Sequence, residues 1–217
     1  MSNINLNRRR TLKLGIFAAS AGVASTGIAQ AVCGDKTPVQ PEGPFYPIQD
    51  QVDKDNDLVR VTGTSQAPKG DVIVVAGKVL DIDCAPVAGA LVEIWQACAS
   101  GKYNHKNDPN AAELDPNFQY WGQAVTDKDG LYSFRTIIPG AYPADVGWIR
   151  PPHIHFKVAK RGYLELITQM YFAGNELNDK DLILKRVKAK DRSKVVIQLK
   201  QANPHPIAVF DITLEKP

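Results

Sequence analysis

Short apolar, β-rich runs separated by turns rich in proline and glycine constrain the fold of this chain more than any other feature. The 217 residues include 15 prolines and 16 glycines, and proline is disfavoured in helix interiors and in central strands. We expect strands at 72–83, 91–96, 122–125, 131–137, 153–158, 166–172, 195–199 and 207–214, and one short helix at 178–187 capped by Asn178. This spacing predicts an all-β domain, an antiparallel β-sandwich with long loops such as 99–120.

The start of the chain carries the pattern of an export signal. Residues 7–13, Asn-Arg-Arg-Arg-Thr-Leu-Lys, resemble the twin-arginine motif, an apolar run rich in small residues follows at 14–29, and Ala29-Gln30-Ala31 has the form of a signal-peptidase site. We therefore expect a signal peptide at 1–31, a single domain at 32–217, and export through the twin-arginine pathway to the periplasm or the medium. The apolar run is too short and too rich in alanine, glycine and serine to make a stable membrane anchor.

The net charge of +3 comes mainly from this leader. Residues 1–31 hold four of the 26 basic residues and no acidic one, which leaves 22 basic residues against 23 acidic ones in the rest of the chain. A domain that is close to neutral gives no case for nucleic-acid binding.

Three cysteines, Cys33, Cys84 and Cys98, allow one disulfide and one free thiol in an oxidising compartment. All three pairings stay open. We favour Cys84 with Cys98, because both residues flank the strand expected at 91–96.

A histidine pair follows two prolines in Arg150-Pro151-Pro152-His153-Ile154-His155. Residues i and i+2 of a strand point to the same face, so His153 and His155 present two imidazoles side by side. The pattern predicts two metal ligands with Arg150 within reach of whatever the metal binds. Two surface histidines on one strand are the alternative.

Seven pieces of sequence place this histidine pair in a larger pattern. They are Glu-Gly-Pro-Phe-Tyr-Pro at 42–47, Pro-Val-Ala-Gly-Ala-Leu-Val-Glu-Ile-Trp-Gln at 86–96, Gly-Lys-Tyr-Asn-His at 101–105, Thr-Asp-Lys-Asp-Gly-Leu-Tyr-Ser-Phe at 126–134, Pro-Gly-Ala-Tyr-Pro at 139–143, Arg-Pro-Pro-His-Ile-His-Phe at 150–156 and Thr-Gln-Met-Tyr-Phe at 168–172. In this order they resemble the intradiol ring-cleavage dioxygenases, closest to the protocatechuate 3,4-dioxygenase type. The resemblance implies a prealbumin-like sandwich as the catalytic domain.

The resemblance also implies a mononuclear, non-haem Fe(III) site whose ligands are Tyr103, Tyr142, His153 and His155. Ferric iron is a hard, strongly charged ion, so phenolate oxygens suit it better than thiolates. Its charge is expected to lower the pKa of both tyrosines well below the ordinary value of about 10.

The expected reaction opens the ring of a catechol with O2 to give a cis,cis-muconate-type dicarboxylate. By its place in the motif, Tyr142 is the ligand that leaves and takes up a substrate proton. Arg150 would stabilise negative charge on the ring, and Gln169 would lie beside the ligand shell. Trp95 and Tyr46 line or roof the substrate pocket, or pack in the core.

A different class of protein fits part of the pattern. The pieces at 86–92 and 126–142 also resemble prealbumin-type or carboxypeptidase-regulatory-like sandwiches, which are non-enzymatic binding modules. A ferric enzyme should purify burgundy red and such a module colourless. The substrate stays open among protocatechuate, catechol, hydroxyquinol and a lignin-derived catechol, and the assembly stays open between a homo-oligomer and a pair with a related subunit.

Overall fold

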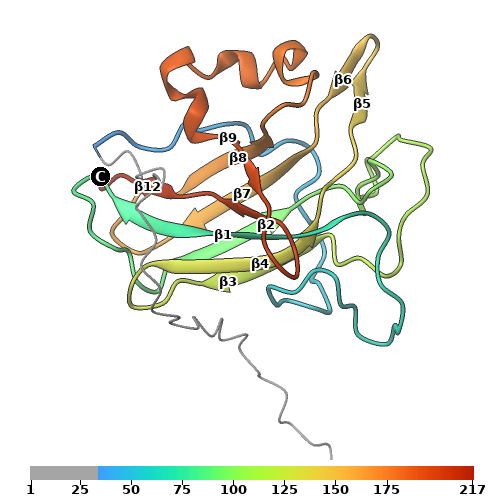
Figure 1. Ribbon diagram of the computed structural model, residues 1–217, viewed down its shortest axis with the longest axis horizontal. Helices are drawn as coiled ribbons and strands as arrows, with labels where there is room; N and C mark the ends of the chain where they lie inside the picture. Colours follow the sequence, from blue (N-terminus) through green and yellow to red (C-terminus); the bar gives the residue numbers. More distant parts are fainter. Residues whose placement is uncertain (1–33) are drawn as a thin grey trace, which may run out of the picture. The chain divides into compact units, whose positions relative to one another are not determined.

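Two five-stranded sheets form the two layers of the fold in a computed structural model that describes residues 34–217 (Figure 1). One sheet contains β1 (Val72–Asp81), β4 (Leu131–Ile137), β10 (Leu199–Lys200), β11 (Ile207–Val209) and β12 (Ile212–Leu214). The other runs in the order β3 (Trp121–Val125), β2 (Leu91–Trp95), β7 (His153–Ala159), β8 (Leu166–Phe172) and β9 (Val196–Ile197). The predicted signal peptide at 1–31 and Cys33 lie outside the described residues.

The core lies between the two sheets and follows from period-two alternation along their strands. On β1, Ile73, Val75 and Val79 are fully buried, and on β7 Ile154 and Phe156 are fully buried. All of them belong to one hydrophobic cluster. Rings from opposite sheets meet directly, since the centroids of Phe156 and Phe210 lie 4.8 Å apart. The β-sandwich predicted from the sequence is confirmed.

The sandwich is not antiparallel throughout. Long pairs such as β1 with β4 and β7 with β8 are antiparallel. Three short pairs are parallel: β1 with β11, β1 with β12, and β8 with β9. None of the three spans more than three residues, so most of the strand pairing in the two sheets is antiparallel.

A small hairpin that the sequence did not predict projects from the domain (Figure 1). It joins β5 (Tyr142–Asp145) to β6 (Trp148–Arg150), and it pairs Tyr142 with Arg150 at its base. The sequence suggested only a turn at 139–143, because Pro143 lacks a donor for the ladder. Such a proline is tolerated here because the hairpin forms a separate two-stranded sheet.

The helix expected at 178–187 is wrong. Two 3₁₀ turns stand there instead, η1 (Asn178–Lys180) and η2 (Leu184–Arg186), and η3 (Ala189–Lys194) follows them. Asn178 caps neither turn, because its side-chain amide donates to the carbonyl of Phe172 at 2.8 Å. Asp181 has extended backbone angles, which end the first turn before the second begins.

The favoured Cys84–Cys98 disulfide is also wrong. Cys98 is a free, buried thiol, whereas Cys84 is disulfide-bonded. The two cysteines flank the opposite ends of the five-residue strand β2. A strand of that length spans about 16 Å, whereas the Cα atoms of a disulfide lie within about 7 Å of each other.

Helices long and apolar enough to cross a membrane do not occur between residues 34 and 217.

Candidate metal centre

Four structural elements converge at one end of the sheet that contains β2, β7 and β8. Strand β7 carries the two histidines, β8 carries Gln169, the β5–β6 hairpin carries Tyr142 and Arg150, and the loop after β2 carries Tyr103. The register places His155 opposite both Trp95 and Gln169. The structure therefore brings together every residue that the sequence proposed as a metal ligand or catalytic group: Tyr103, Tyr142, Arg150, His153, His155 and Gln169.

The four candidate ligands form a compact cluster of rings. The ring centroids of His153 and His155 are 4.9 Å apart, those of Tyr103 and Tyr142 are 5.4 Å apart, and those of Tyr142 and His153 are 5.7 Å apart. The Tyr103 hydroxyl lies 3.4 Å from Nε2 of His153. Each of the four side chains is at least 95% buried. Such a gathering of polar groups in a core calls for a partner that satisfies them.

The histidines present ring nitrogens that are suited to a metal. Nδ1 of His153 lies 2.7 Å from the carbonyl of Pro151, which only accepts, so Nδ1 is the donor and Nε2 keeps its lone pair on the side of Tyr103. His155 stacks on Trp95 with centroids 4.8 Å apart and planes 11° apart. Its Nδ1 is buried and has no hydrogen-bond partner among residues 34–217.

Burial keeps both imidazoles neutral. Desolvation holds the pKa of His153 and of His155 well below the ordinary histidine value, and the positive charge of Arg150 acts in the same direction. Neutral imidazole is the form that binds metals, so both histidines are ready to bind a metal without first losing a proton.

The phenols respond to burial in the opposite sense. Desolvation raises the pKa of Tyr103 well above the ordinary value, and it raises the pKa of Tyr142 while Arg150 lowers it. Without a metal both hydroxyls keep their protons. A strongly charged cation would instead lower the pKa of both phenols, because a bound ion is usually the largest local charge in its site.

The donor set fits a hard trivalent ion. Among residues 34–217 no three His, Cys, Asp or Glu side chains gather in a way that could hold a metal, so a metal at this cluster needs the two tyrosine oxygens. Two phenolates and two neutral imidazoles offer two negative charges and four ligand atoms. That combination suits ferric iron better than the thiolate sets that select softer ions.

Arg150 lies beside the cluster and is held on three sides. It is 97% buried. Its Nη1 lies 2.9 Å from Nε2 of His153, its Nη2 donates to Oε1 of Gln169 at 2.7 Å and to the Tyr171 hydroxyl at 3.1 Å, and its Nε donates to Asp181 at 3.0 Å. Gln169 therefore lies next to the cluster, as the sequence predicted, and it acts on it through Arg150.

Sequence reasoning missed two of these neighbours, Tyr171 and Asp181. Tyr171 belongs to a motif that was recognised, Thr-Gln-Met-Tyr-Phe, and its alternation with Gln169 on one strand face was a usable signal. Asp181 had no such signal. It stands in the segment expected to form a short helix at 178–187, and it is fully buried.

Aromatic side chains from residues 45 and 46 cover the cluster. The Phe45 ring lies 4.6 Å from the ring of Tyr103 and 6.0 Å from that of Tyr142. Tyr46 packs edge-on against Trp95 at 5.0 Å, and its hydroxyl donates to Glu93 at 3.1 Å. Trp95 is buried and stacks beside His155, and the partly buried Tyr46 packs over Trp95. Phe45 is a third covering residue, which the sequence analysis quoted in its motif but did not select.

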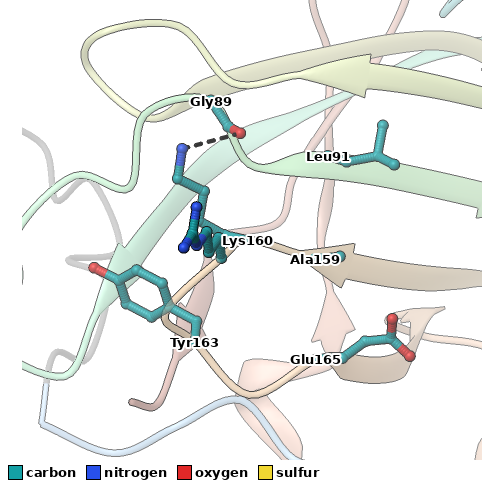
Figure 2. A pocket seen from close by; sticks show the side chains of 7 residues that line it. Gly89, Leu91, Ala159, Lys160, Tyr163 and Glu165 are labelled. Atoms are coloured by element: carbon teal, nitrogen blue, oxygen red, sulfur yellow. Dashed lines mark hydrogen bonds between the residues drawn. The ribbon is translucent and has the colours of Figure 1, made fainter. Parts of the chain in front are cut away.

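Two cavities lie away from this cluster, since neither is lined by any of its residues. One, of about 370 Å³, opens at the other end of β2 and β7 and is lined by Gly89, Leu91, Ala159, Lys160, Arg161, Tyr163 and Glu165 (Figure 2). The other, of about 200 Å³, lies beside Cys98 and Ser100.

Comparison with known proteins gives one family and a consistent set of relatives. The model of a family described as "Dioxygenase" matches residues 41–215. The protocatechuate 3,4-dioxygenase beta chain of Burkholderia cepacia is 42% identical over 157 residues, which cover 70% of this chain and 66% of the relative. Chlorocatechol 1,2-dioxygenase of Pseudomonas sp. strain P51 is 37% identical over 123 residues, which cover 50% of this chain and 47% of the relative. The matched segments thus span less than two thirds of these relatives.

Solved structures agree with the sequence comparison. The dioxygenase domain of a dioxygenase–carbohydrate-binding protein fusion from Streptomyces sp. SirexAA-E has a TM-score of 0.64 and 30% identity, and the match covers 84% of this chain and all of that one. The 3-chlorocatechol 1,2-dioxygenase of Rhodococcus opacus 1CP has a TM-score of 0.67 and 27% identity, and the match covers 83% of this chain and 73% of that one.

Proposed function

The chain belongs to the intradiol dioxygenase family, and from this premise we propose that it cleaves the aromatic ring of a catechol between the two hydroxylated carbons. O2 supplies both added oxygen atoms, and the product is a cis,cis-muconate-type dicarboxylate. The observation that carries the proposal is the buried cluster of two phenols and two neutral imidazoles, held at one end of a sheet beside a buried guanidinium.

We propose that Tyr103, Tyr142, His153 and His155 hold one Fe(III) ion. When bound, the ion would draw both catechol oxygens into its coordination and make the ring reactive toward O2. The protein supplies four ligand atoms and a shell that keeps bulk water out. Phe45 and Trp95 form the apolar part of that shell through their contacts with Tyr103 and His155.

Tyr142 is the proposed proton acceptor. It lies at the base of the β5–β6 hairpin, opposite Arg150 in the ladder, and burial favours its protonated form. A phenolate oxygen of Tyr142 in this environment would take up a proton readily. The proton that the catechol loses as it binds therefore has an acceptor within the cluster.

Arg150 is the proposed electrostatic group. Its buried guanidinium is a fixed positive charge beside the histidines, and fixed donors aimed at developing negative charge stabilise it without reorganisation. Negative charge that develops on the ring during attack by O2 would lie beside it.

Protocatechuate, catechol, hydroxyquinol and a lignin-derived catechol are the candidate substrates, and they differ in the substituents on the ring. The experiment is an oxygen-uptake screen of the iron-loaded protein over these four substrates, with absorbance of the product as the second readout. Consumption of one O2 per catechol together with a muconate-type product supports the proposal. Absence of uptake with all four contradicts it.

We also propose that the protein is exported by the twin-arginine pathway and that it assembles with itself or with a related subunit. The support for export is the motif at residues 7–13 and the cleavage pattern at 29–31. Fractionation of expressing cells tests export, since changing both Arg8 and Arg9 to Lys should leave the protein in the cytoplasm. Light scattering of the purified protein tests self-assembly.

A further inference from the structure

We propose that Asp181 is a positioning residue for the ring cleavage, because it holds the Arg150 guanidinium in the one orientation that leaves Nη1 facing the candidate iron ligands. This inference rests on the proposed function and adds to it a residue from outside the ligand shell. Within residues 34–217 Asp181 makes no hydrogen bond to a candidate ligand, so it acts through Arg150.

The carboxylate of Asp181 is itself fixed in place. It is fully buried. One oxygen, Oδ1, accepts hydrogen bonds from the backbone N–H groups of Ile183 at 3.0 Å and Leu184 at 2.7 Å. The other, Oδ2, accepts from Nε of Arg150 at 3.0 Å. Because the backbone of the second 3₁₀ turn anchors the carboxylate, the guanidinium adapts to Asp181 and not the reverse.

The remaining contacts of Arg150 leave a single direction open. Nη2 donates to Gln169 and Tyr171 and makes a longer contact of 3.5 Å with Oδ1 of Asp181, and Nε donates to Oδ2 of Asp181. Only Nη1 points to the cluster, where it lies 2.9 Å from Nε2 of His153. That lone pair is the one that iron would take. With that lone pair given to a metal, Nη1 would lack this acceptor and would be available as a donor on the side of the cluster.

Charge supports the same assignment. Within residues 34–217, Asp181 is the one acidic residue that forms an ion pair with Arg150, and both side chains are nearly or fully buried. Removing one partner of a buried ion pair leaves an uncompensated charge. Without Asp181 the guanidinium would be free to turn toward Tyr142, with which it already interacts electrostatically.

A purely structural role for Asp181 predicts a different outcome, and the chain offers a matched control. Asp57 accepts from Nε and Nη2 of Arg135, both at 2.7 Å, in an ion pair on the other sheet. Its hydrogen bonds are at least as short as that of Asp181 with Arg150, although Arg135 is more exposed than Arg150, and within residues 34–217 no hydrogen bond joins either member to the cluster. Asp57→Asn therefore reports what loss of such an ion pair does to stability alone.

The test compares wild type, Asp181→Asn, Asp57→Asn, Arg150→Gln and the double variant Arg150→Gln/Asp181→Asn, all loaded with iron. We expect Asp181→Asn to lower kcat by about 10- to 100-fold, as is typical when a group that orients a functional residue is lost, with a smaller change in KM. Iron content and the visible absorption of the protein should match wild type. Asp57→Asn should lower the unfolding temperature and keep kcat within about 2-fold of wild type.

The double variant separates positioning from structure. If Asp181 acts through Arg150, adding Asp181→Asn to Arg150→Gln should change kcat by less than about 2-fold, because the group that it positions is already absent. Effects that multiply in the double variant would overturn the proposal. Asp181→Glu serves as a second variant should Asp181→Asn not fold, since it keeps the charge; its kcat should lie below wild type with iron content unchanged.

A readout without iron keeps the inference distinct from the proposed function. In the iron-free full chain, the Nε–H of Arg150 should exchange slowly with solvent by NMR, and exchange should quicken in Asp181→Asn but not in Asp57→Asn. An active wild type with Asp181→Asn at wild-type kcat would overturn the inference alone. Lack of ring cleavage in wild type would overturn the proposed function, while the Nε–H exchange would still confirm or contradict the pairing of Asp181 with Arg150.

Discussion

The two ends of the strand pair β2–β7 share one backbone geometry and differ in what lies over them. At one end Trp95 stands opposite His155, and at the other Leu91 stands opposite Ala159. The four residues point to the same outer face of the sheet, since they lie an even number of positions apart along each strand. At the first end Trp95 and His155 are almost fully buried, whereas at the second Leu91 and Ala159 line an open cavity (Figure 2).

The two ends share the ladder geometry, so the segments that cover the first end create its buried environment. Phe45 and the β5–β6 hairpin close the first end, and burial there holds the histidines neutral. At the open end Nζ of Lys160 donates to the carbonyl of Gly89 at 3.3 Å in a contact that is exposed to water. We therefore expect substitutions at the two ends to have sharply different consequences.

The largest contrast is between His155 and Ala159. His155→Ala removes a candidate ligand, so iron content should fall well below one per chain and oxygen uptake should drop to the rate without protein. Ala159→Ser, on the same strand at the open end, should keep both at wild-type values. Metal analysis and oxygen uptake are measured for both variants. Equal iron content and equal uptake in the two variants would contradict the expectation.

Arg150 should matter for turnover and not for iron. Arg150→Gln removes the fixed charge, so kcat should fall by about 10²- to 10³-fold, as for loss of one well-placed electrostatic donor. The unfolding free energy should also fall by about 3 to 5 kcal/mol, because Asp181 is left buried and unpaired. Steady-state kinetics and urea unfolding measure these effects. Arg161→Gln, at the open end, is the matched change and should leave kcat unaltered.

The covering segment should contribute more to stability than the uncovered surface. Phe45→Ala takes a buried ring away from Tyr103 and Tyr142 and should lower the unfolding free energy by about 3 kcal/mol. Val125→Ala, at the open end and 65% exposed, should change it by less than about 0.5 kcal/mol. Urea unfolding of both variants tests the comparison, and a larger effect at Val125 would refute it.

The smallest expected effect is a loss of folding stability at alkaline pH that comes from Tyr46. Burial, with Glu93 next to it, raises the pKa of the Tyr46 phenol to about 12. Because the pKa of Tyr46 is higher in the folded state, this group contributes its full stabilisation below the unfolded pKa of about 10. The contribution is lost as pH rises through the folded pKa of about 12. Stability of wild type relative to Tyr46→Phe should therefore fall between pH 10 and 12. The effect is modest because Tyr46 is partly exposed, and a flat difference over that range would contradict it.

Local patterns predicted much of the candidate site. Alternation alone placed His153 and His155 on one face of their strand, opposite Ile154 and Phe156, which the structure buries in the core. The roles of Tyr103 and Tyr142 came from a resemblance, because nothing local marks a loop tyrosine as a ligand. Gln169 followed from the same resemblance, and the ladder then put it directly opposite His155.

The failures share a physical cause, which is that they depend on contacts between distant segments. Asp181 meets Arg150 across 31 residues, and its burial cannot be read from a charged, helix-like segment. Cys84 and Cys98 are close in sequence but are separated by the length of β2. The β5–β6 hairpin contains Pro143, which argues against a strand unless the strand lies in a sheet of its own.

A visible absorption spectrum recorded while Fe(III) is added to the metal-free protein tests the four proposed ligands together. We expect a tyrosinate-to-iron charge-transfer band that grows to one iron per chain, turns the protein red, and weakens in both Tyr103→Phe and Tyr142→Phe. A wild-type protein that binds no iron and stays colourless, or a band that persists when both tyrosines are replaced, would contradict this expectation.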